Sequence, residues 1–474
     1  MTFNFNQNMK KIFIIFGLFI LNLLAFSQNQ LDNFIKNPLL ENANISLLVK
    51  DLNTNQTLYQ FSSKNSVTPA STMKLVTTAT ALEMLGPDFC YKTTLAIDGN
   101  ITKDSVLLGN LYIHGSGDPT LGSEKTGDID FLSKWIQAVK VAGINKITGQ
   151  IIADAGIFDD EGVNPHWTWE DIGNYYAAGA YGIAYLDNTC KVILRSGKDD
   201  TTPEILRTMP EIKNLSFENY LKSTKINYDS AYFYGAPHSD HRIIRGEIPA
   251  NKTEFTVKCD IPNPGLLLAE HFQSKLIQAG ISVNQKPTDI IPFYYNSKVI
   301  YTHLSPTLSQ IITETNIHSN NLYAEQIFRY LGFSGKSTSN QAIKNIKLFW
   351  KSKGLPVEEL FQLDGCGLSP SDAVSAEFLV DLLIFMNRSP NKDVFLNSLP
   401  VAGESGTLSN FLKNTELRGK VHAKSGTITR VKSYAGYLEE NNKKLVFALL
   451  VNNANGGSKE VTRKIEEFLL EISK

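Results

Sequence analysis

The sequence has few cysteines, few long apolar runs and no excess of charge of either sign. Its 474 residues include four cysteines, and no two of these have the Cys-x-x-Cys spacing of a structural zinc site. Lysine and arginine together number 46 and aspartate and glutamate 47, so the net charge is −1. This balance argues against a nucleic-acid-binding protein and against strong adhesion to an anionic surface. Internal repeats and low-complexity segments are also absent.

The scattered cysteines leave their redox state open. Cys90, Cys190, Cys259 and Cys366 could form disulfides in an exported protein, but four cysteines allow three pairings and the sequence does not choose among them. Four free and mostly buried thiols are at least as consistent with this spacing. We therefore expect no disulfide in particular.

The first residues carry the features of an export signal. A lysine pair at positions 10 and 11 precedes the apolar run Ile12–Phe26, and small residues stand at the two positions that cleavage after Ser27 requires. The run is too short for a confident membrane span, and no cysteine follows the cut to carry a lipid. We expect residues 1–27 to be a signal peptide, with Met1 or Met9 as the start. The protein is then exported and periplasmic, with at most peripheral membrane contact.

One motif, Ser71-Thr72-Met73-Lys74, opens an apolar helix that ends at Gly86. Ser71 lies at or near the first turn, and Lys74 follows three residues later on the same helix face. A lysine held out of water near the positive end of a helix can have a lowered pKa and take the proton of a serine. Ser-x-x-Lys alone is common, and a capping serine beside a surface lysine would explain it equally well.

Two further motifs follow in the order that an acyl-transfer site requires. Ser319-Asn320-Asn321 lies in a break between two helices, where the Ser319 hydroxyl could relay a proton and the Asn321 amide could hold a peptide carbonyl. Lys424-Ser425-Gly426-Thr427 lies next to a pair of strands. There Gly426 would admit a substrate backbone, Lys424 supplies positive charge, and two hydroxyls can bind a carboxylate. A polar turn and a glycine bulge are the simpler explanations of each motif taken alone.

The remaining pattern predicts a mixture of strands and helices. Strands are expected at Asn44–Asp51 and Thr57–Phe61 before the Ser71 helix, and at Val431–Glu439 and Lys443–Asn452 before a last amphipathic helix. Residues 189–249 contain several short strand-like runs. An aromatic loop over residues 166–179 either lines a cleft or is pinned by its own buried rings.

Taken together, these motifs resemble the penicillin-binding protein 4 family of D-alanyl-D-alanine carboxypeptidases and endopeptidases. The interval from Lys74 to Ser319 is much longer than in a β-lactamase, and the resemblance covers essentially the whole mature chain. Two positions depart from the family pattern, because Ser425 replaces the commoner threonine and Cys366 stands where serine is expected. Other stretches that match are Gly117–Leu121, Trp167–Asp171, Asp364–Ser369, Leu399–Gly403 and Gly406–Leu408.

The resemblance implies an α+β fold, in which a penicillin-binding/β-lactamase-like domain, an antiparallel sheet flanked by helices, is interrupted by two smaller inserted domains. We expect the catalytic domain over residues 28–95 and 296–474. Inserted domain II would take residues 96–188 and 254–295, and a small β-rich domain III residues 189–253. A chain of 474 residues is also too long to fold around a single hydrophobic core, which favours two or three domains.

The resemblance also implies roles for the motif residues. Ser71 attacks the penultimate D-alanine carbonyl of a peptidoglycan stem peptide with Lys74 as base, and the backbone N–H groups of Ser71 and Thr427 form the oxyanion hole. Ser319 passes a proton to the leaving amine, and Asn321 positions the peptide. The terminal carboxylate, or that of a penicillin, is bound by Lys424, Ser425 and Thr427.

Three expectations at the edge of the site complete this interpretation. Asp171 would contact a free amine on the substrate's diamino acid. Cys366 would lie near the mouth of the active site, as its Gly-rich loop does in the resembled family. The reaction needs no metal or organic cofactor.

Two alternatives remain at this point. The first is another acyl-enzyme of the same fold, a β-lactamase or an esterase. The second is a non-catalytic protein that binds the cell wall on a retired enzyme fold. The intact Ser71 and Lys74 pair argues against the second alternative. Neither the balance of carboxypeptidase and endopeptidase activity, nor the stem-peptide chemistry, nor the oligomeric state follows from the sequence.

Overall fold

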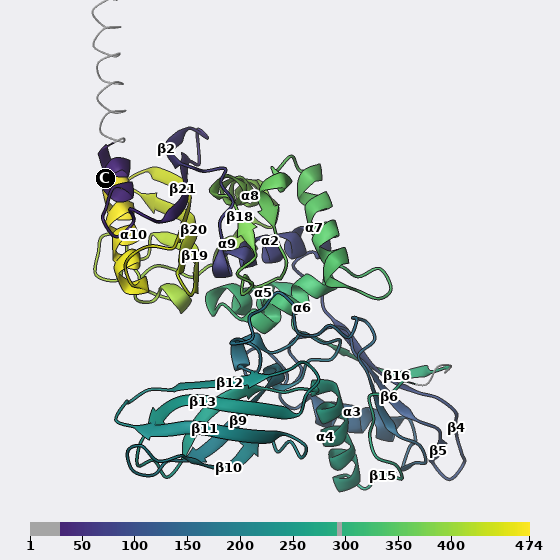
Figure 1. The fold of residues 1–474 in the computed structure, drawn as a ribbon. Helices are drawn as coiled ribbons and strands as arrows, with labels where there is room; N and C mark the ends of the chain where they lie inside the picture. The colour runs from purple at the N-terminus through teal and green to yellow at the C-terminus, as the bar shows by residue number, and fades with distance from the viewer. Residues whose placement is uncertain (1–28, 292–295) are drawn as a thin grey trace, which may run out of the picture.

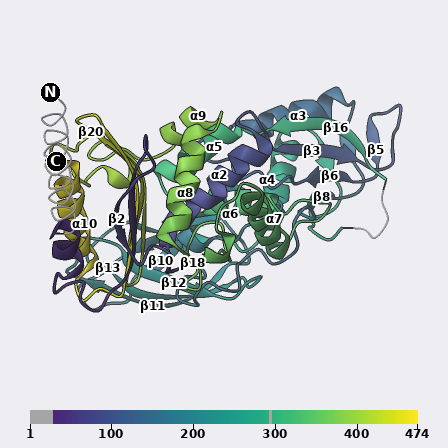
Figure 2. The same ribbon diagram turned by 90° about the horizontal axis from the view of Figure 1, so that it is seen from above.

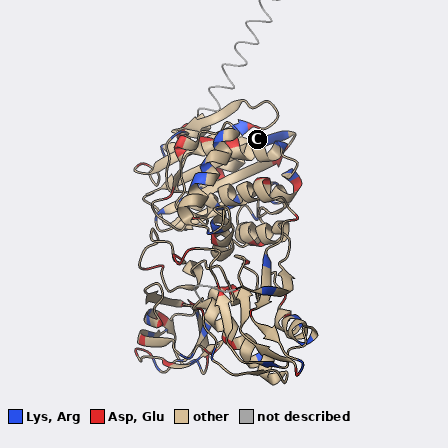
Figure 3. Ribbon diagram, turned by 90° about the vertical axis from the view of Figure 1, so that its right-hand side faces the viewer, with Lys and Arg blue, Asp and Glu red and all other residues tan. Residues whose placement is uncertain are grey.

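The computed structural model describes residues 29–291 and 296–474, so the predicted signal peptide and both candidate starts lie outside the described residues. The two ends of the described chain lie together in one half of the molecule, and the middle of the chain builds the other half (Figure 1). Basic and acidic residues are interspersed over both halves (Figure 3). Over the described ranges, no helix has both the length and the apolar character needed to cross a membrane.

The half that holds the chain ends, here called the terminal half, is built on an antiparallel sheet in the order β19-β20-β21-β1-β2. Strand β21 is buried along almost its whole length, because helices cover both faces of the sheet. In Figure 2 helix α10 lies on one side of this sheet and α8 on the other. The strands are β1 (Asn44–Asp51), β2 (Thr57–Phe61), β19 (Val421–Ile428), β20 (Val431–Glu440) and β21 (Lys443–Asn452).

Helix α2 runs through the centre of the helical layer, and its residues from Met73 to Leu82 are all buried. Its buried threonines are satisfied locally: the Thr78 hydroxyl donates to the carbonyl of Lys74, and the Thr80 hydroxyl donates to Val76 and accepts from the Trp350 indole. The helices of this half are α2 (Met73–Leu85), α5 (Leu308–Ile317), α6 (Asn321–Tyr330), α7 (Ser339–Ser352), α8 (Ala376–Arg388), α9 (Lys392–Asn397) and α10 (Ser458–Ser473). A two-stranded ladder pairs β17 (Leu360–Phe361) with β18 (Ala373–Val374).

The other half contains a four-stranded sheet in the order β16-β3-β6-β8 and a smaller one in the order β15-β7-β5-β4. Two helices pack on these sheets, and their buried aromatic side chains Phe131, Trp135 and Phe272 join one continuous core. The elements are β3 (Lys92–Ile97), β4 (Asn100–Ile101), β5 (Val106–Leu108), β6 (Leu111–His114), α3 (Phe131–Val141), β7 (Lys146–Ile147), β8 (Ile151–Asp154), α4 (Pro264–Gln278), β15 (Ser282–Val283) and β16 (Lys298–Leu304).

A β-rich unit of two three-stranded sheets completes this half. One sheet has the order β10-β9-β14 and the other β11-β13-β12, and they share the same apolar core. The strands are β9 (Thr189–Arg195), β10 (Glu204–Met209), β11 (Ser216–Thr224), β12 (Ser230–Gly235), β13 (His241–Pro249) and β14 (Phe255–Asp260).

Two ladders cross the domain boundaries that the sequence predicts. Strand β14 pairs with β9 across the expected boundary at residue 253, and β3, which contains the boundary at residue 95, pairs with β16. The division into three domains therefore stays a prediction. The strands expected at 44–51, 57–61, 431–439 and 443–452, in contrast, are confirmed to within one residue at their ends.

One cysteine pair in the β-rich unit generates a prediction. Cys190 and Cys259 stand directly opposite each other on β9 and β14, both are buried, and their Sγ atoms are 2.8 Å apart. We expect a disulfide to form here when the protein folds in the presence of oxidised glutathione. Closing a loop between positions 69 apart should stabilise the protein by about 4 kcal/mol.

Alkylation in denaturant followed by intact-mass measurement tests this pairing. Two alkylated thiols, at Cys90 and Cys366, are the expected result, and the Cys190→Ser variant should gain a third. Four alkylated thiols in the oxidatively folded wild type would contradict the prediction.

Candidate active site

Ser71 stands in a short 3₁₀ turn, Ala70–Thr72, that leads directly into α2. The turn is fixed by the Thr72 hydroxyl, which donates to the Pro69 carbonyl at 2.8 Å. Lys74 lies one turn further on, and its Nζ is 3.0 Å from Ser71 Oγ. The structure thus brings together the first pair of residues that the sequence singled out.

The Lys74 amine is buried completely and has three hydrogen-bond acceptors. Besides Ser71 Oγ, these are the side-chain oxygen of Asn321 at 2.7 Å and the carbonyl of Cys366 at 2.8 Å. Burial lowers the pKa of Lys74, although nearby acidic groups oppose the shift. A dry amine beside a hydroxyl is the arrangement that a general base requires.

The Ser319-Asn320-Asn321 motif lies where α5 ends and α6 begins. The Asn320 side chain caps α6 by accepting from the N–H of Tyr323, while Ser319 has a φ of 56°, in the left-handed region that residues other than glycine rarely adopt. The Asn321 amide bridges Lys74 and the Tyr176 carbonyl, to which its Nδ2 donates at 2.8 Å. The tight break between the helices therefore directs the side chains of Ser319 and Asn321 toward the cavity that Ser71 also lines.

Lys424 approaches the same place from β19, at the edge of the sheet. Its side chain is fully buried, and its Nζ donates to Ser319 Oγ at 3.0 Å and to the Ser425 carbonyl at 2.8 Å. Burial, reinforced by the neighbouring Lys74 and Lys432, lowers the pKa of Lys424 well below its usual range. A positive charge here would need an anion in the cavity to offset its desolvation.

Gly426 allows β19 to pack directly on the turn that carries Ser71. A Cβ at this position would lie 2.2 Å from the Ser433 hydroxyl oxygen, 2.6 Å from the Pro69 carbonyl oxygen and 2.9 Å from the Ser71 nitrogen. The sequence suggested that the missing side chain admits the substrate backbone. In the structure the protein's own turn fills that space.

The two hydroxyls of this strand segment have different surroundings. Thr427 lines the cavity, and its hydroxyl accepts from Lys432 Nζ at 2.8 Å. The Ser425 hydroxyl instead donates to Thr407 at 2.9 Å, and Ser425 is not among the residues that line the cavity. Lys432 was not expected from the sequence, although it stands opposite Thr427 in the β19–β20 ladder.

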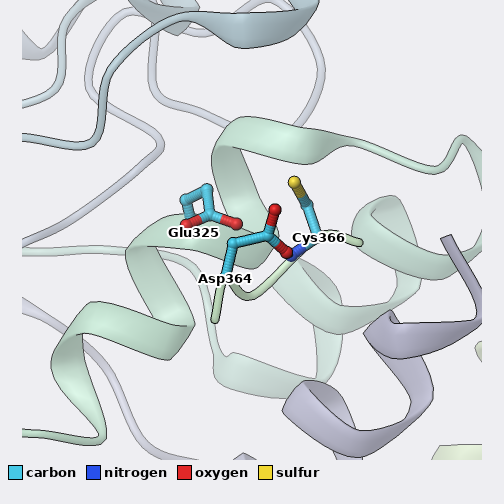
Figure 4. Close-up of side chains that lie close together, drawn as sticks. All are labelled: Glu325, Asp364 and Cys366. Carbon is cyan, nitrogen blue, oxygen red and sulfur yellow. The ribbon is translucent and has the colours of Figure 1, made fainter. Parts of the chain in front are cut away.

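Glu325, Asp364 and Cys366 form a buried cluster (Figure 4), and these groups act electrostatically on Lys74. The Asp364 carboxylate accepts from the backbone N–H groups of residues 366–369 at 2.5 to 3.0 Å and from the Trp167 indole at 2.8 Å. Glu325 accepts from the N–H of Gly365 at 2.7 Å, and burial, together with the charge of Asp364, raises its pKa to about 8. Because both oxygens of Asp364 are already occupied by N–H donors, the cluster organises the loop rather than forming an open metal site.

The expected position of Cys366 at the mouth of the site is wrong. Its carbonyl reaches Lys74, but its side chain is fully buried and lies beside Glu325 and Asp364 (Figure 4). The next two residues of the loop, Gly367 and Leu368, line the cavity instead. The resemblance located the loop correctly but gave no information on which way the thiol points.

Ser71, Ser319, Asn321 and Thr427, which represent all three motifs, line one cavity of about 650 Å³. Its lining includes Ser71, Thr168, Glu170, Asp171, Tyr176, Tyr232, Tyr234, Ser319, Asn321, Gly367, Leu368, Pro370, Thr427, Ile428 and Thr429. Both interpretations of the aromatic loop hold, because Trp167 is buried against Asp364 while Asp171 faces the cavity and accepts from the Thr168 hydroxyl at 2.6 Å. Tyr232 and Tyr234, from β12, were missed by sequence reasoning, although their alternation with buried Phe233 was visible in it.

Comparison with known proteins agrees with this geometry. The sequence profile of the D-Ala-D-Ala carboxypeptidase 3 (S13) family matches residues 27–472. A D-alanyl-D-alanine carboxypeptidase from an Actinomadura species is 28% identical over 450 residues, which cover 91% of this chain and 81% of that protein. The D-alanyl-D-alanine carboxypeptidase DacB of Haemophilus influenzae is 24% identical over 438 residues, 90% of this chain and 88% of that protein.

The fold is also found among solved structures. The crystal structure of penicillin binding protein 4 from Haemophilus influenzae superposes with a TM-score of 0.79 at 20% identity, covering 95% of this chain and 99% of that one. The expected α+β fold of the penicillin-binding type is thereby confirmed, as is the resemblance on which it was based. Since the family profile spans nearly the whole chain, this protein belongs to the D-Ala-D-Ala carboxypeptidase 3 (S13) family of serine peptidases.

Proposed function

We propose that the protein cleaves D-alanyl-D-alanine bonds of peptidoglycan stem peptides outside the cytoplasm, with Ser71 as nucleophile and Lys74 as base. The observation that carries this proposal is the buried Lys74 amine, 3.0 Å from Ser71 Oγ at the wall of a cavity that the three motifs share. Family membership supplies the substrate class, and the predicted export signal supplies the location.

The acylation step follows from these contacts. Neutral Lys74 takes the hydroxyl proton of Ser71 as Oγ attacks the carbonyl of the penultimate D-alanine, and the developing oxyanion accepts from the backbone N–H groups of Ser71 and Thr427. The proton then passes through the Ser319 hydroxyl to the amine of the terminal D-alanine, which leaves as the ester forms. Asn321 holds the Lys74 amine from the other side and presents its amide to the peptide.

The terminal carboxylate binds at Thr427, the residue of the third motif that lines the cavity. Lys424 and Lys432 supply positive charge that burial leaves poorly solvated, and the Thr427 hydroxyl lies between Lys432 and the cavity. Ser425 contributes to this recognition through the hydrogen bond from its hydroxyl to Thr407 at the edge of the strand.

The acyl-enzyme is then hydrolysed. Water attacks the ester, and Lys74 again takes the proton.

A β-lactam should react with the same serine, because its strained amide next to a carboxylate resembles D-alanyl-D-alanine. The Haemophilus influenzae penicillin binding protein 4 has been crystallised in complex with a β-lactam. A non-catalytic wall-binding protein is disfavoured, since burying Lys74 beside Ser71 costs stability without benefit to simple binding.

Exposure to benzylpenicillin tests the nucleophile. We expect a single covalent adduct on a peptide containing Ser71 that persists for minutes or longer, because the leaving nitrogen stays tethered and obstructs water. Intact-protein mass spectrometry followed by peptide mapping detects it. Ser71→Ala, which removes one oxygen, should stay folded, form no adduct and lose peptide hydrolysis by roughly a million-fold.

The other outcomes of this experiment separate the alternatives. Rapid penicillin hydrolysis without a lasting adduct would identify a β-lactamase. Neither adduct nor hydrolysis would support a binding protein on a retired fold, and an adduct on another serine would refute the site itself.

The pH dependence of the acylation rate should follow the ionisation of the proposed base, Lys74. Because burial lowers the pKa of Lys74, its neutral fraction grows as pH rises through that lowered value. We expect the acylation rate to rise by about tenfold per pH unit below this pKa and to level off above it. Stopped-flow measurement with a chromogenic β-lactam gives the profile.

Two variants control for this profile. Lys74→Arg places a group there that remains protonated, so it should be inactive over the whole range. An acylation rate that is independent of pH, together with near-normal acylation in Lys74→Ala, would rule Lys74 out as the base.

Asp171 is proposed to bind a free amine on the diamino acid of the stem peptide. Its carboxylate lines the cavity beside Glu170 and Tyr176. Asp171→Asn should raise KM about tenfold for a stem peptide that carries the amine, the loss expected for one charge-assisted hydrogen bond. A peptide with the amine acetylated is the comparison, and equal effects on both peptides would count against the contact.

A further inference from the structure

An exposed row of aromatic side chains crosses the outer face of the β11–β13–β12 sheet. Tyr220 on β11 stands opposite Arg245 on β13, and Arg245 stands opposite Tyr232 on β12. Tyr220 is 52% exposed and Tyr232 45% exposed. Because paired residues of neighbouring strands point to the same face, these three side chains form one continuous row.

The outward-facing rings of Tyr220 and Tyr232 are not part of the hydrophobic core that stabilises this sheet. The alternate residues of the same strands, Leu221, Phe233 and Ile244, point inward and are almost completely buried in the core. Outward positions of such a sheet are normally polar, so large rings there usually mark an interaction surface. The row is thus best explained by a ligand.

The row is continuous with the active-site cavity. Tyr232 and Tyr234 both line that cavity, and Trp169 packs on Tyr234 with ring centroids 4.9 Å apart while remaining 62% exposed. In Figure 1 β12 is the strand of this sheet that lies nearest the terminal half. We call this set the aromatic strip: Trp169, Tyr234, Tyr232, Arg245 and Tyr220.

The outer end of the strip carries a cation, the guanidinium of Arg245. The Arg245 guanidinium lies over the Tyr220 ring at 5.0 Å, and the Tyr220 hydroxyl donates to Glu218. Within the two described ranges, no carboxylate lies within salt-bridge distance of Arg245. The strip therefore offers flat rings together with hydrogen-bond donors at their rim.

We propose that the aromatic strip binds the carbohydrate strand of peptidoglycan while a stem peptide of that strand occupies the cavity. Sugar rings present apolar C–H faces that stack on tyrosine and tryptophan, and their hydroxyl groups need polar partners at the rim of such rings. The carbohydrate strand is the part of the polymer that must lie next to a bound stem peptide. This inference rests on the proposed function for its choice of polymer.

The test uses glycan strands stripped of their peptides, and full-length protein. The double variant Tyr220→Ala/Arg245→Ala removes the outer end of the strip without touching a cavity residue. The control is Phe361→Ala, since Phe361 is 51% exposed beneath the Lys347 amine on the terminal half. Tyr220→Phe keeps the ring and loses only the hydroxyl.

We expect wild type, Phe361→Ala and Tyr220→Phe to cosediment with stripped glycan, and the double variant to bind about tenfold more weakly. The double variant should release D-alanine from intact peptidoglycan about tenfold more slowly. Its hydrolysis of a free stem peptide and its acylation by benzylpenicillin should be unchanged, which also shows that it is folded.

Absence of glycan binding by the wild type, or unchanged binding by the double variant, would overturn the proposal. Equal losses on polymer and free peptide would also overturn it, because the strip would then belong to the peptide site. Failure of the proposed function is a different result: wild type would neither hydrolyse free stem peptide nor form the penicillin adduct, whatever its glycan binding.

Discussion

The arrangement of the site depends on keeping one lysine amine out of water. A buried ammonium is costly unless it is neutralised or fully hydrogen-bonded, and Lys74 meets this constraint with acceptors from three separate segments, at Ser71, Asn321 and Cys366. Its own helix is buried from Met73 to Leu82, so the amine cannot swing out to solvent. The same confinement that lowers its pKa also holds it against the Ser71 hydroxyl.

The Cys366 carbonyl can serve Lys74 because the loop that carries it is tightly fixed. Asp364 binds the loop's own N–H groups, and Gly367, at φ +78°, lies so close to the Ala70 carbonyl that a Cβ would come within 1.9 Å of that oxygen. The Trp167 indole also donates to Asp364, which ties a loop from the middle of the chain to this support. The middle of the chain thus helps to hold Lys74, besides lining the cavity.

The sequence predicted the local parts of this site because each is encoded over a few residues. Ser71 and Lys74 share a helix face, and the break at Ser319 follows from where two apolar periodicities stop. Contacts between distant segments could not be predicted in this way. Glu325 appears in the sequence as one acidic residue of an amphipathic helix, and Lys432 faces Thr427 only through a strand register that no local pattern fixes.

The two halves of the molecule contribute different side chains to the site, because each half lines a different wall of the cavity. Ser71 lies in the turn before α2, Lys74 on α2, Ser319 at the α5–α6 break and Lys424 on β19, and packed hydrophobic cores and one sheet hold these elements. Asp171, Tyr176 and Tyr232 come from the other half, and the hydrogen bond from Asn321 to the Tyr176 carbonyl fixes that wall of the cavity against Lys74 and its neighbours. Changes in β12 or in the aromatic loop can therefore alter which ligand fits the cavity without moving Ser71 or Lys74.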